Sequence, residues 1–314
     1  MHLQTNIMEQ EERDLMIKAA ISGYLHECKA DLNGCCIKLL SDDAEFKEMW
    51  QDNFKPFSNY IRPHGRIFAV TSKEYGTNDL FYEPISKTCF LYNCDYYGHV
   101  KSIALAIAGD FLEEYRTIHS RYSVHGAAID VRGRGMALIA PSGTGKTTLS
   151  YGLLLDPRSR LVSDDWFYAQ VLGDIVLCSA SEENVYIRAS MQETYPEFAE
   201  TIEMMKMDST QRGIVDISGI LGNAKKATST VMEKTVFLER DPQDEPFYKM
   251  DAKEAMDYIV EQDFCNPHLL VTTGYKTKIR KDFFKEFFER TDVYMLNTVE
   301  TPQQSLDRLK KLMP

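Results

Sequence analysis

The sequence has few of the features that mark a disulfide-rich, zinc-binding or membrane-spanning protein. Its seven cysteines include the adjacent pair Cys35 and Cys36 and no C-x-x-C spacing, so neither a zinc site nor a disulfide framework is expected. No apolar run is long enough to span a bilayer, and the start of the chain turns acidic early, without a basic stretch before an apolar core. We therefore expect no secretory signal and no membrane partner, and we predict reduced thiols in a cytoplasmic protein.

Basic charge is also scarce. The chain carries 36 lysines and arginines against 47 acidic residues, a net charge of −11, whereas nucleic-acid binders carry a positive footprint. No internal repeat or low-complexity segment is present. Nucleic acid is therefore not expected as a partner. The 314 residues, 44% of them hydrophobic, are sufficient for two globular domains.

What the sequence does contain is a glycine-rich turn between an apolar strand and a helix. Residues 140–147 read A-P-S-G-T-G-K-T, which fits the Walker A pattern G-x-x-x-x-G-K-[ST] except that Ala140 replaces the first glycine. The glycines let backbone N–H groups turn toward an anion, and the helix start adds further N–H groups. Lys146 is expected to reach the β- and γ-phosphates and the Thr147 hydroxyl to face Mg²⁺, so ATP and Mg²⁺ are the predicted cofactors. The predicted nucleotide-binding residues are Pro141, Ser142, Gly143, Thr144, Gly145, Lys146, Thr147 and Thr148.

The pattern around this loop supplies the elements that the motif needs. Two strands joined by a turn, then a helix and a third strand, are expected at residues 127–131, 136–140, 148–155 and 160–163. The third strand ends in Asp164 and Asp165. Carboxylates at this place can hold Mg²⁺ or accept a proton from an attacking hydroxyl. Because adjacent side chains of a strand point to opposite faces, only one of the two is expected to face the site.

Two domains are predicted, an α+β domain of unknown role over residues 1–122 and a P-loop kinase-like catalytic domain over residues 123–314. In the first, we expect helices at residues 8–30, 43–55 and 102–121, with short aromatic strands at 67–70, 80–82 and 89–92. In the second, we expect a strand pair at residues 174–178 and 183–188, strands at 234–238, 269–273 and 293–297, and helices at 280–290 and 301–312. Residues 191–212 are interpreted as a helix or a mobile flap. Arg188, Lys225 and Lys226 either contact phosphate or lie on the surface.

From His125 to Trp166 the sequence resembles the C-terminal catalytic domain of the HPr kinase/phosphorylase family. The resemblance rests on His-Gly before the first strand, Ser-Gly-Thr-Gly-Lys-Thr in the loop, and Arg-Leu-Val-Ser-Asp-Asp at the third strand. The loop and the paired aspartates are also similar to the kinase motifs of ATP-dependent phosphoenolpyruvate carboxykinase, a structurally related family. The resemblance implies an α/β fold with α+β character, in which a P-loop nucleotide-binding domain of this type follows a smaller N-terminal α+β domain. It also allows a homo-oligomer.

The resemblance implies a role for each polar residue of this region. Lys146 is implied to bind the transferring phosphate, and His125 to lie beside the reacting groups. Thr147 and Asp165 are the predicted Mg²⁺ ligands. Asp165 is also the implied base toward the acceptor hydroxyl, with Asp164 as the alternative. The predicted catalytic residues are Asp165, Asp164, His125 and Lys146.

The function expected from these residues is ATP-dependent transfer of a γ-phosphate to a hydroxyl of a protein serine or a small metabolite. Two alternatives stay open. One is a catalytically silent ATP-binding sensor. The stretch Glu-Ile-Arg-Gly-Leu-Gly, which supplies HPr kinases with a second acidic metal ligand, is missing from this sequence. Its nearest counterpart is residues 186–189, where Tyr186 stands at the position of the glutamate. The other is a carboxykinase-type lyase, for which the chain is short. No motif identifies the acceptor.

Overall fold

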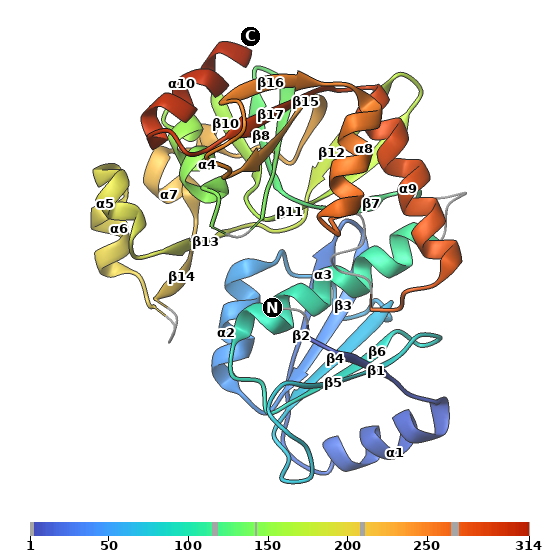
Figure 1. Ribbon diagram of the computed structural model, residues 1–314. Helices are drawn as coiled ribbons and strands as arrows, with labels where there is room; N and C mark the ends of the chain where they lie inside the picture. The colour runs from blue at the N-terminus through green and yellow to red at the C-terminus, as the bar shows by residue number, and fades with distance from the viewer. Residues whose placement is uncertain (1–2, 115–118, 142, 208–210, 265–269, 314) are drawn as a thin grey trace. The chain divides into compact units, whose positions relative to one another are not determined.

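The computed structural model describes residues 3–114, 119–141, 143–207, 211–264 and 270–313. The fold is mixed α/β and divides into two compact units (Figure 1). Unit 1 comprises Met1–His119 with His268–Thr273, and unit 2 comprises Ser120–Pro267 with Gly274–Pro314. The boundary predicted from the sequence is instead a single one, after residue 122. Within the described ranges, none of the helices combines the length and the apolar character that crossing a bilayer requires.

Unit 1 is built on a mixed sheet covered by helices on both faces. Among its described residues the strand order is β1 (Thr5–Ile7), β5 (Asp79–Glu83), β6 (Thr88–Tyr92), β4 (Gly65–Val70), β3 (Cys35–Ser41) and β2 (His26–Leu32). Phe68, Val70 and Phe90 pack with Met16 of α1 (Gln10–Ala20) on one face. α2 (Ala44–Asn53) contacts β2, and α3 (Tyr97–Glu114) contacts β3 and β4. A side chain at Gly65 would meet Ile107 of α3, which places α3 on the other face.

The first predicted helix, over residues 8–30, is wrong in its second half. The helix α1 ends at Ala20, and β2 begins at His26 and pairs antiparallel with β3. Asn33 and Gly34 join these strands with φ angles of 54° and 86°, the left-handed conformation that favours Asn-Gly in a two-residue hairpin. β2 lies at the edge of its sheet, and edge strands keep charged side chains. Its sequence is therefore as polar as the surface of a helix. The Asn-Gly pair was the signal for the hairpin.

Unit 2 is organised around the long strand β15 (Ser229–Glu239). Among the described residues its sheet has the order β10 (Ser159–Ser163), β8 (Ala127–Val131), β9 (Arg134–Ile139), β15, β12 (Ile175–Ala180), β11 (Trp166–Leu172) and β7 (Tyr122–His125). β15 runs parallel to β9 along one side. On its other side, the first part of β15 pairs with β12, and the second part pairs in parallel with β17 (Asp292–Asn297), which continues to β16 (Phe247–Met250).

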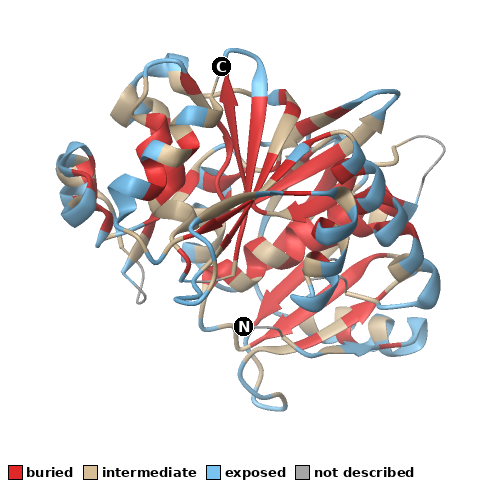
Figure 2. Ribbon diagram, turned by 45° about the horizontal axis from the view of Figure 1, so that its top comes forward, coloured by how far each residue is buried: buried red, intermediate tan, exposed pale blue. Residues whose placement is uncertain are grey.

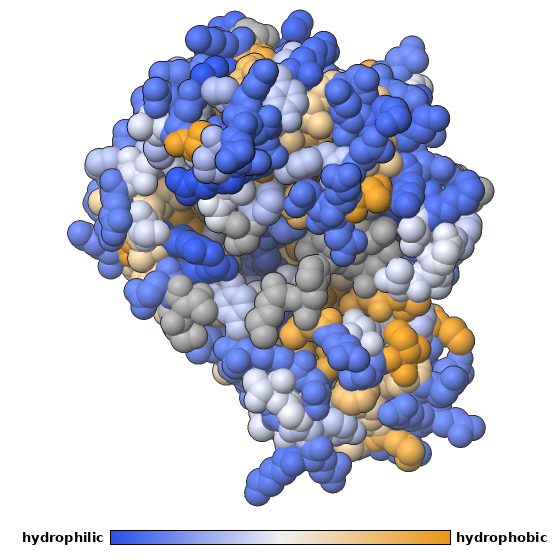
Figure 3. Space-filling view, viewed as in Figure 1, coloured by the Kyte–Doolittle hydropathy of each residue, from blue (hydrophilic) through white to orange (hydrophobic). Residues whose placement is uncertain are grey.

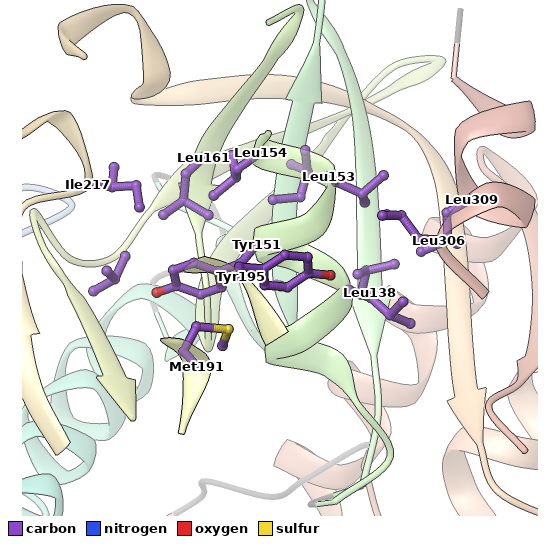
Figure 4. Packing of buried hydrophobic residues seen from close by; sticks show 14 of the residues in the cluster. Leu138, Tyr151, Leu153, Leu154, Leu161, Met191, Tyr195, Ile217, Leu306 and Leu309 are labelled. Carbon is purple, nitrogen blue, oxygen red and sulfur yellow. The ribbon is translucent and has the colours of Figure 1, made fainter. Parts of the chain in front are cut away.

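Alternating residues of the central strands supply two hydrophobic cores, one on each face of this sheet. Ile129 and Leu138 pack with α4 (Lys146–Leu154) and α10 (Pro302–Leu312), and Figure 4 shows Leu153 of α4 directed toward Leu306 of α10. Ile139 belongs to the opposite core. There α8 (Ala252–Glu261) packs with α9 (Gly274–Glu289), which contributes four phenylalanines. The strands between the helix layers are accordingly buried along most of their length (Figure 2).

Two predictions for this part of the chain are wrong, and one strand was not predicted. The segments 174–178 and 183–188 do not pair with each other, because β12 pairs with β11 and β15, and β13 (Val185–Arg188) pairs with β14 (Arg212–Val215) in a separate small sheet. Residues 270–273 form no strand, while Leu269 lies outside the described residues. The sequence predicts the first strand of this domain at residue 127, whereas β7 precedes it. Pairing partners far apart in sequence leave no local pattern, which explains the first error.

The methionine-rich segment, for which the sequence predicts a helix or a mobile flap, forms short helices. These are α5 (Met191–Thr194), a 3₁₀ turn at Pro196–Phe198, and α6 (Ala199–Met204), followed after β14 by α7 (Ile217–Leu221) and a second 3₁₀ turn at Asn223–Lys225. Phe198 and Ile202 are buried in the core that also contains α4. Residues 208–210 lie outside the described residues. The described part of this segment is therefore packed against the helix that follows the glycine-rich loop.

A carboxyl pair at the end of β15 gives unit 2 a pH-dependent stability. Burial raises the pKa of Glu239 from its usual 4.5 to about 7, and a hydrogen bond with Asp244 adds to the shift. A carboxyl whose folded-state pKa is raised contributes stability below its unfolded pKa and loses that contribution as the pH rises through the folded value. The free energy of unfolding should therefore fall between about pH 4.5 and 7.

We expect Glu239→Gln to remove this dependence, because glutamine cannot ionise. The expected difference is about 1 kcal/mol across the window, after discounting for the water that reaches a half-exposed carboxyl. Denaturant unfolding at pH 4.5, 5.5 and 7 measures it, with Glu245→Gln, at an exposed neighbouring position, as control. An equal slope in wild type and Glu239→Gln would contradict the assignment.

Candidate functional site

The glycine-rich loop connects the end of β9 at Ile139 to the start of α4 at Lys146. Gly143 and Gly145 have φ angles of 89° and 98°, a conformation that disfavours other residues, and a Cβ built on either would meet nothing within 4 Å. The loop is tied across its base by the Thr144 hydroxyl, which donates to the Pro141 carbonyl at 2.8 Å. Ser142 lies outside the described residues. Gly143 and Gly145 therefore leave open space beside the backbone, as close approach of an anion requires.

The helix α4 begins directly at this loop. Gly145 is its N-cap and offers no side chain, while the first hydrogen bond along the helix joins the Leu149 N–H to the Gly145 carbonyl. The N–H groups of the preceding turn, which includes Thr147 and Thr148, consequently have no partner within the helix, and the helix dipole makes this end positive. Leu149 and the residues that follow are buried in the core. The core thus fixes a helix end that attracts negative charge.

Asp164 and Asp165 lie in the short connection between β10 and β11. The Asp165 carbonyl accepts a hydrogen bond from the Gly126 N–H at 3.0 Å, and Trp166 pairs with His125 between β11 and β7. A Cβ atom at Gly126 would lie 2.8 Å from the carbonyl oxygen of Leu138 on β9. The close approach of residue 126 to β9 therefore requires glycine. The pairing of β7 with β11 brings His125 to the same place as Asp165.

Lys146, Asp165 and His125 meet at one point of the structure. The Nζ of Lys146 lies 2.7 Å from Oδ1 of Asp165 and 3.3 Å from the Asp164 carbonyl oxygen. Nε2 of His125 lies 3.4 Å from the same Asp165 oxygen. The side chain of Lys146 is 12% exposed and that of Asp165 is 45% exposed. The acid is therefore accessible to a substrate, whereas the lysine is largely enclosed.

The two aspartates differ in their surroundings. Asp164 is buried, and its Oδ2 lies 3.5 Å from the hydroxyl of Tyr151 on α4. Burial, with the Asp164 charge as the next contribution, raises the pKa of Tyr151 well above its usual value, so the phenol stays protonated and can donate to the carboxylate. Asp165 instead faces Lys146 and His125. Of the two acids, Asp165 is the one placed for chemistry with an external group.

The residues fit Mg²⁺ only together with phosphate oxygens. Among the described residues, no group of three or more histidine, cysteine, aspartate or glutamate side chains is arranged to hold a metal ion. Mg²⁺ is commonly held by one or two protein ligands, with substrate phosphates and water completing its shell. Thr147 and Asp165, the two ligands predicted from the sequence, would be that number. A bound nucleotide would have to supply the remainder.

The other basic residues named in the sequence make different contacts, although Lys226 lines a pocket that Asp164 also lines. Arg188 is exposed on β13, and in the strand register it lies opposite Arg212 of β14. The Nζ of Lys225 donates to the carbonyls of Leu154 and Asp156, both at 2.6 Å, and so supports the C-terminal end of α4. Lys226 forms an ion pair with Asp216 at 2.7 Å. Lys225 has a structural role that the sequence could not show, because its partner carbonyl at Leu154 lies 71 residues away.

The comparisons with known proteins give a distant likeness. No family model matches the chain. Over 87 residues, 28% of this chain, it is 32% identical to an HPr kinase/phosphorylase of Chlorobium phaeovibrioides, and the match covers 25% of that protein. The chain thus matches only about a quarter of the length of this curated relative. The likeness supports a distant relationship over this part of the chain.

Proposed function

We propose that unit 2 is an ATP-dependent phosphotransferase that moves the γ-phosphate of ATP to a hydroxyl group. The observation that carries the proposal is the position of Asp165, 2.7 Å from Lys146 at the end of the glycine-rich loop and 3.4 Å from His125. A phosphotransferase needs an anion cradle, a cation beside the transferring group and a base for the acceptor. The loop, Lys146 and Asp165 meet these needs within one site.

Lys146 exchanges its ion pair with Asp165 for a contact with phosphate when the nucleotide binds. Its ammonium group pairs with Asp165 at 2.7 Å. When the loop and the start of α4 hold a triphosphate, the negative phosphate oxygens compete for the same ammonium group. Lys146 then turns to the phosphate. Thr147 and Asp165 would hold Mg²⁺, which would add charge stabilisation. Asp165 is released from the ion pair at the moment when an acceptor can be bound.

Asp165 then serves as the base. Its carboxylate accepts the proton of the acceptor hydroxyl while the acceptor oxygen bonds to the γ-phosphorus and ADP leaves. His125, whose Nε2 faces the same carboxylate oxygen, holds the carboxylate in position and can share the proton. Asp164 is left to support α4 through Tyr151. The acceptor is either a protein serine or a small hydroxylated molecule.

One observation favours a second candidate, a silent ATP-binding sensor. Tyr186, which stands in the place of the acidic residue of HPr kinases, carries the guanidinium of Arg212 over its ring at 5.9 Å. This position therefore supplies an aromatic surface and no carboxylate. A protein with one acidic metal ligand fewer would hold ATP and fail to transfer its phosphate. The same transfer experiment separates the two candidates.

The experiment is transfer of labelled γ-phosphate from ATP, with Mg²⁺, into the protein and small-molecule fractions of a desalted extract. We expect label in one fraction with the wild type, and about a hundredfold less with Lys146→Ala, because a charge beside the transferring phosphate is lost. Lys253→Ala, at an 83% exposed lysine of α8, is the matched control and should transfer normally. ATP binding without transfer by the wild type would establish the sensor instead. ADP formation that depends on oxaloacetate would indicate the lyase.

A further inference from the structure

Unit 1 contains a cavity of about 430 Å³ that is separate from the site in unit 2. One wall is the second half of α1, from Leu15 to Ala20, and the turn that follows it. The other wall is formed where three strands end, by Asp42 after β3, Val70 of β4 and Tyr92 of β6. Small-molecule sites have volumes of roughly 300–1,000 Å³, so the cavity is large enough for a small ligand.

The cavity lies at the carboxyl ends of parallel strands. β3 and β4 run parallel with Ser41 opposite Ala69, and β4 and β6 run parallel with Val70 opposite Tyr92. Because these neighbouring strands end at the same edge, the loops that follow them open into one space. In open α/β sheets, ligands bind in the crevice outside the carboxyl ends of the strands. The position of the cavity is therefore the one at which this architecture holds ligands.

The floor of the cavity is aromatic. Tyr75 stacks on Tyr92 with ring centroids 3.9 Å apart and planes 10° apart. Phe90 stacks behind Tyr92, and Phe68 stacks behind Phe90. Hydrophobic side chains also reach the surface of this unit, as Figure 3 shows over α1 and the strands beside it, and Leu15 at the cavity is 66% exposed. A stack of rings backed by the core offers a rigid surface for a flat or apolar ligand body.

The charge of the cavity is negative. Of the described residues that line it, the charged ones are Asp42 and Glu74, and none is lysine, arginine or histidine. The Thr71 N–H donates to Oδ2 of Asp42 at 2.7 Å, which fixes that carboxylate at the strand ends. Glu74 lines the cavity together with Tyr75 and Tyr92, and burial raises the pKa of Tyr92. The negative end of the α1 dipole, at Ala20, reinforces the preference for a cation.

We propose that unit 1 binds a small organic cation in this cavity, an ammonium group carried on an aromatic or aliphatic body. The ammonium group forms charge-assisted hydrogen bonds with Asp42 and Glu74. The body lies on the ring of Tyr75, whose face also attracts the positive charge. Leu15 and Met16 enclose the apolar side. An anion of the same shape would be repelled by both carboxylates. The proposal does not depend on phosphate transfer by unit 2.

Calorimetric titration of the full chain tests the charge preference. The probes are phenethylamine, tryptamine and hexylamine, each compared with the carboxylate of similar shape: 3-phenylpropionate, indole-3-propionate and hexanoate. We expect saturable binding of at least one amine, at least tenfold tighter than its carboxylate counterpart. If none of the three amines saturates the protein, or if the carboxylates bind as tightly, the proposal is wrong.

Three variants locate the binding. Ala19→Trp, at an exposed position of the α1 wall, should fill the cavity and abolish amine binding without disturbing the core. Asp42→Asn and Glu74→Gln should each weaken it at least fivefold. The control is Glu12→Gln, an exposed carboxylate of the same helix outside the cavity lining, which should bind as the wild type does. Amine binding that survives Ala19→Trp unchanged would place the amine elsewhere and overturn the proposal.

Discussion

Asp165→Asn should reduce phosphate transfer about a thousandfold and leave ATP binding within a few-fold of the wild type. Asparagine has the size of aspartate and cannot accept the proton of the acceptor hydroxyl, and general-base catalysis is commonly worth 10²–10⁴-fold. Asp165 is the acid whose carboxylate meets both Lys146 and His125. Binding of the nucleotide depends chiefly on the loop and on Lys146, which this substitution leaves in place.

Asp164→Asn is the comparison that decides between the two aspartates. Asp164 is buried against Tyr151, and asparagine keeps an oxygen that can accept from the phenol. We expect a loss of transfer below tenfold, measured as initial rates at saturating ATP with binding followed separately. If Asp164→Asn abolished transfer and Asp165→Asn kept it, the roles would be reversed. If both variants kept full activity, neither aspartate would be the base.

Asp130→Ala should lower the free energy of unfolding of unit 2 by about 3 kcal/mol, the largest stability effect that we predict. Asp130 lies on β8 and is 0% exposed. Its Oδ2 accepts two hydrogen bonds from Arg160 of β10, at 2.9 and 2.7 Å, and its Oδ1 accepts one at 2.7 Å from the buried hydroxyl of Thr230 on β15. Alanine removes every acceptor at once. The Thr230 hydroxyl is then left without this partner in the interior, and Arg160, whose side chain is 42% exposed, loses both of its bonds to the carboxylate.

Tryptophan fluorescence can measure this effect in unit 2 alone. The chain has two tryptophans, so in a Trp50→Phe background the signal comes from Trp166, which is buried on β11. Denaturant unfolding of Asp130→Ala in that background gives the free energy. Asp257→Ala, which breaks an exposed ion pair with Lys253, is the control and should change it by less than about 0.5 kcal/mol. A similarly small change in Asp130→Ala would show that the carboxylate does not hold the strands together.

The sequence was most informative where its signals are local. The hairpin of residues 127–139, the glycine-rich loop and the helix after it all lie where the pattern predicts, because turn chemistry and the change from strand to helix periodicity are encoded within a few residues. The strand that ends at Ser163 before the paired aspartates is likewise confirmed. The roles predicted for Lys146, Asp165 and His125 stay predictions, although the structure brings these three side chains together.

The sequence was least informative where partners are far apart along the chain. Nothing in residues 122–125 shows that they pair with β11, and this pairing is what brings His125 to Asp165. The contact of Lys225 with the end of α4 is equally invisible. The charged residues of β2 predict a helix, whereas pairing with β3 makes them a strand. Long-range pairing is set by the packing of the whole sheet, which a local pattern does not contain.

Calorimetric titration with ATP in the presence of Mg²⁺ tests the central claim most directly, because every step proposed for unit 2 begins with phosphate in the loop. We expect one ATP to bind per chain, and we expect Lys146→Ala to bind it at least tenfold more weakly, since the enclosed ammonium group is lost. Lys253→Ala should bind ATP as the wild type does. If the wild type binds no ATP, or if Lys146→Ala binds it equally well, the site does not hold the nucleotide and the account of unit 2 is wrong.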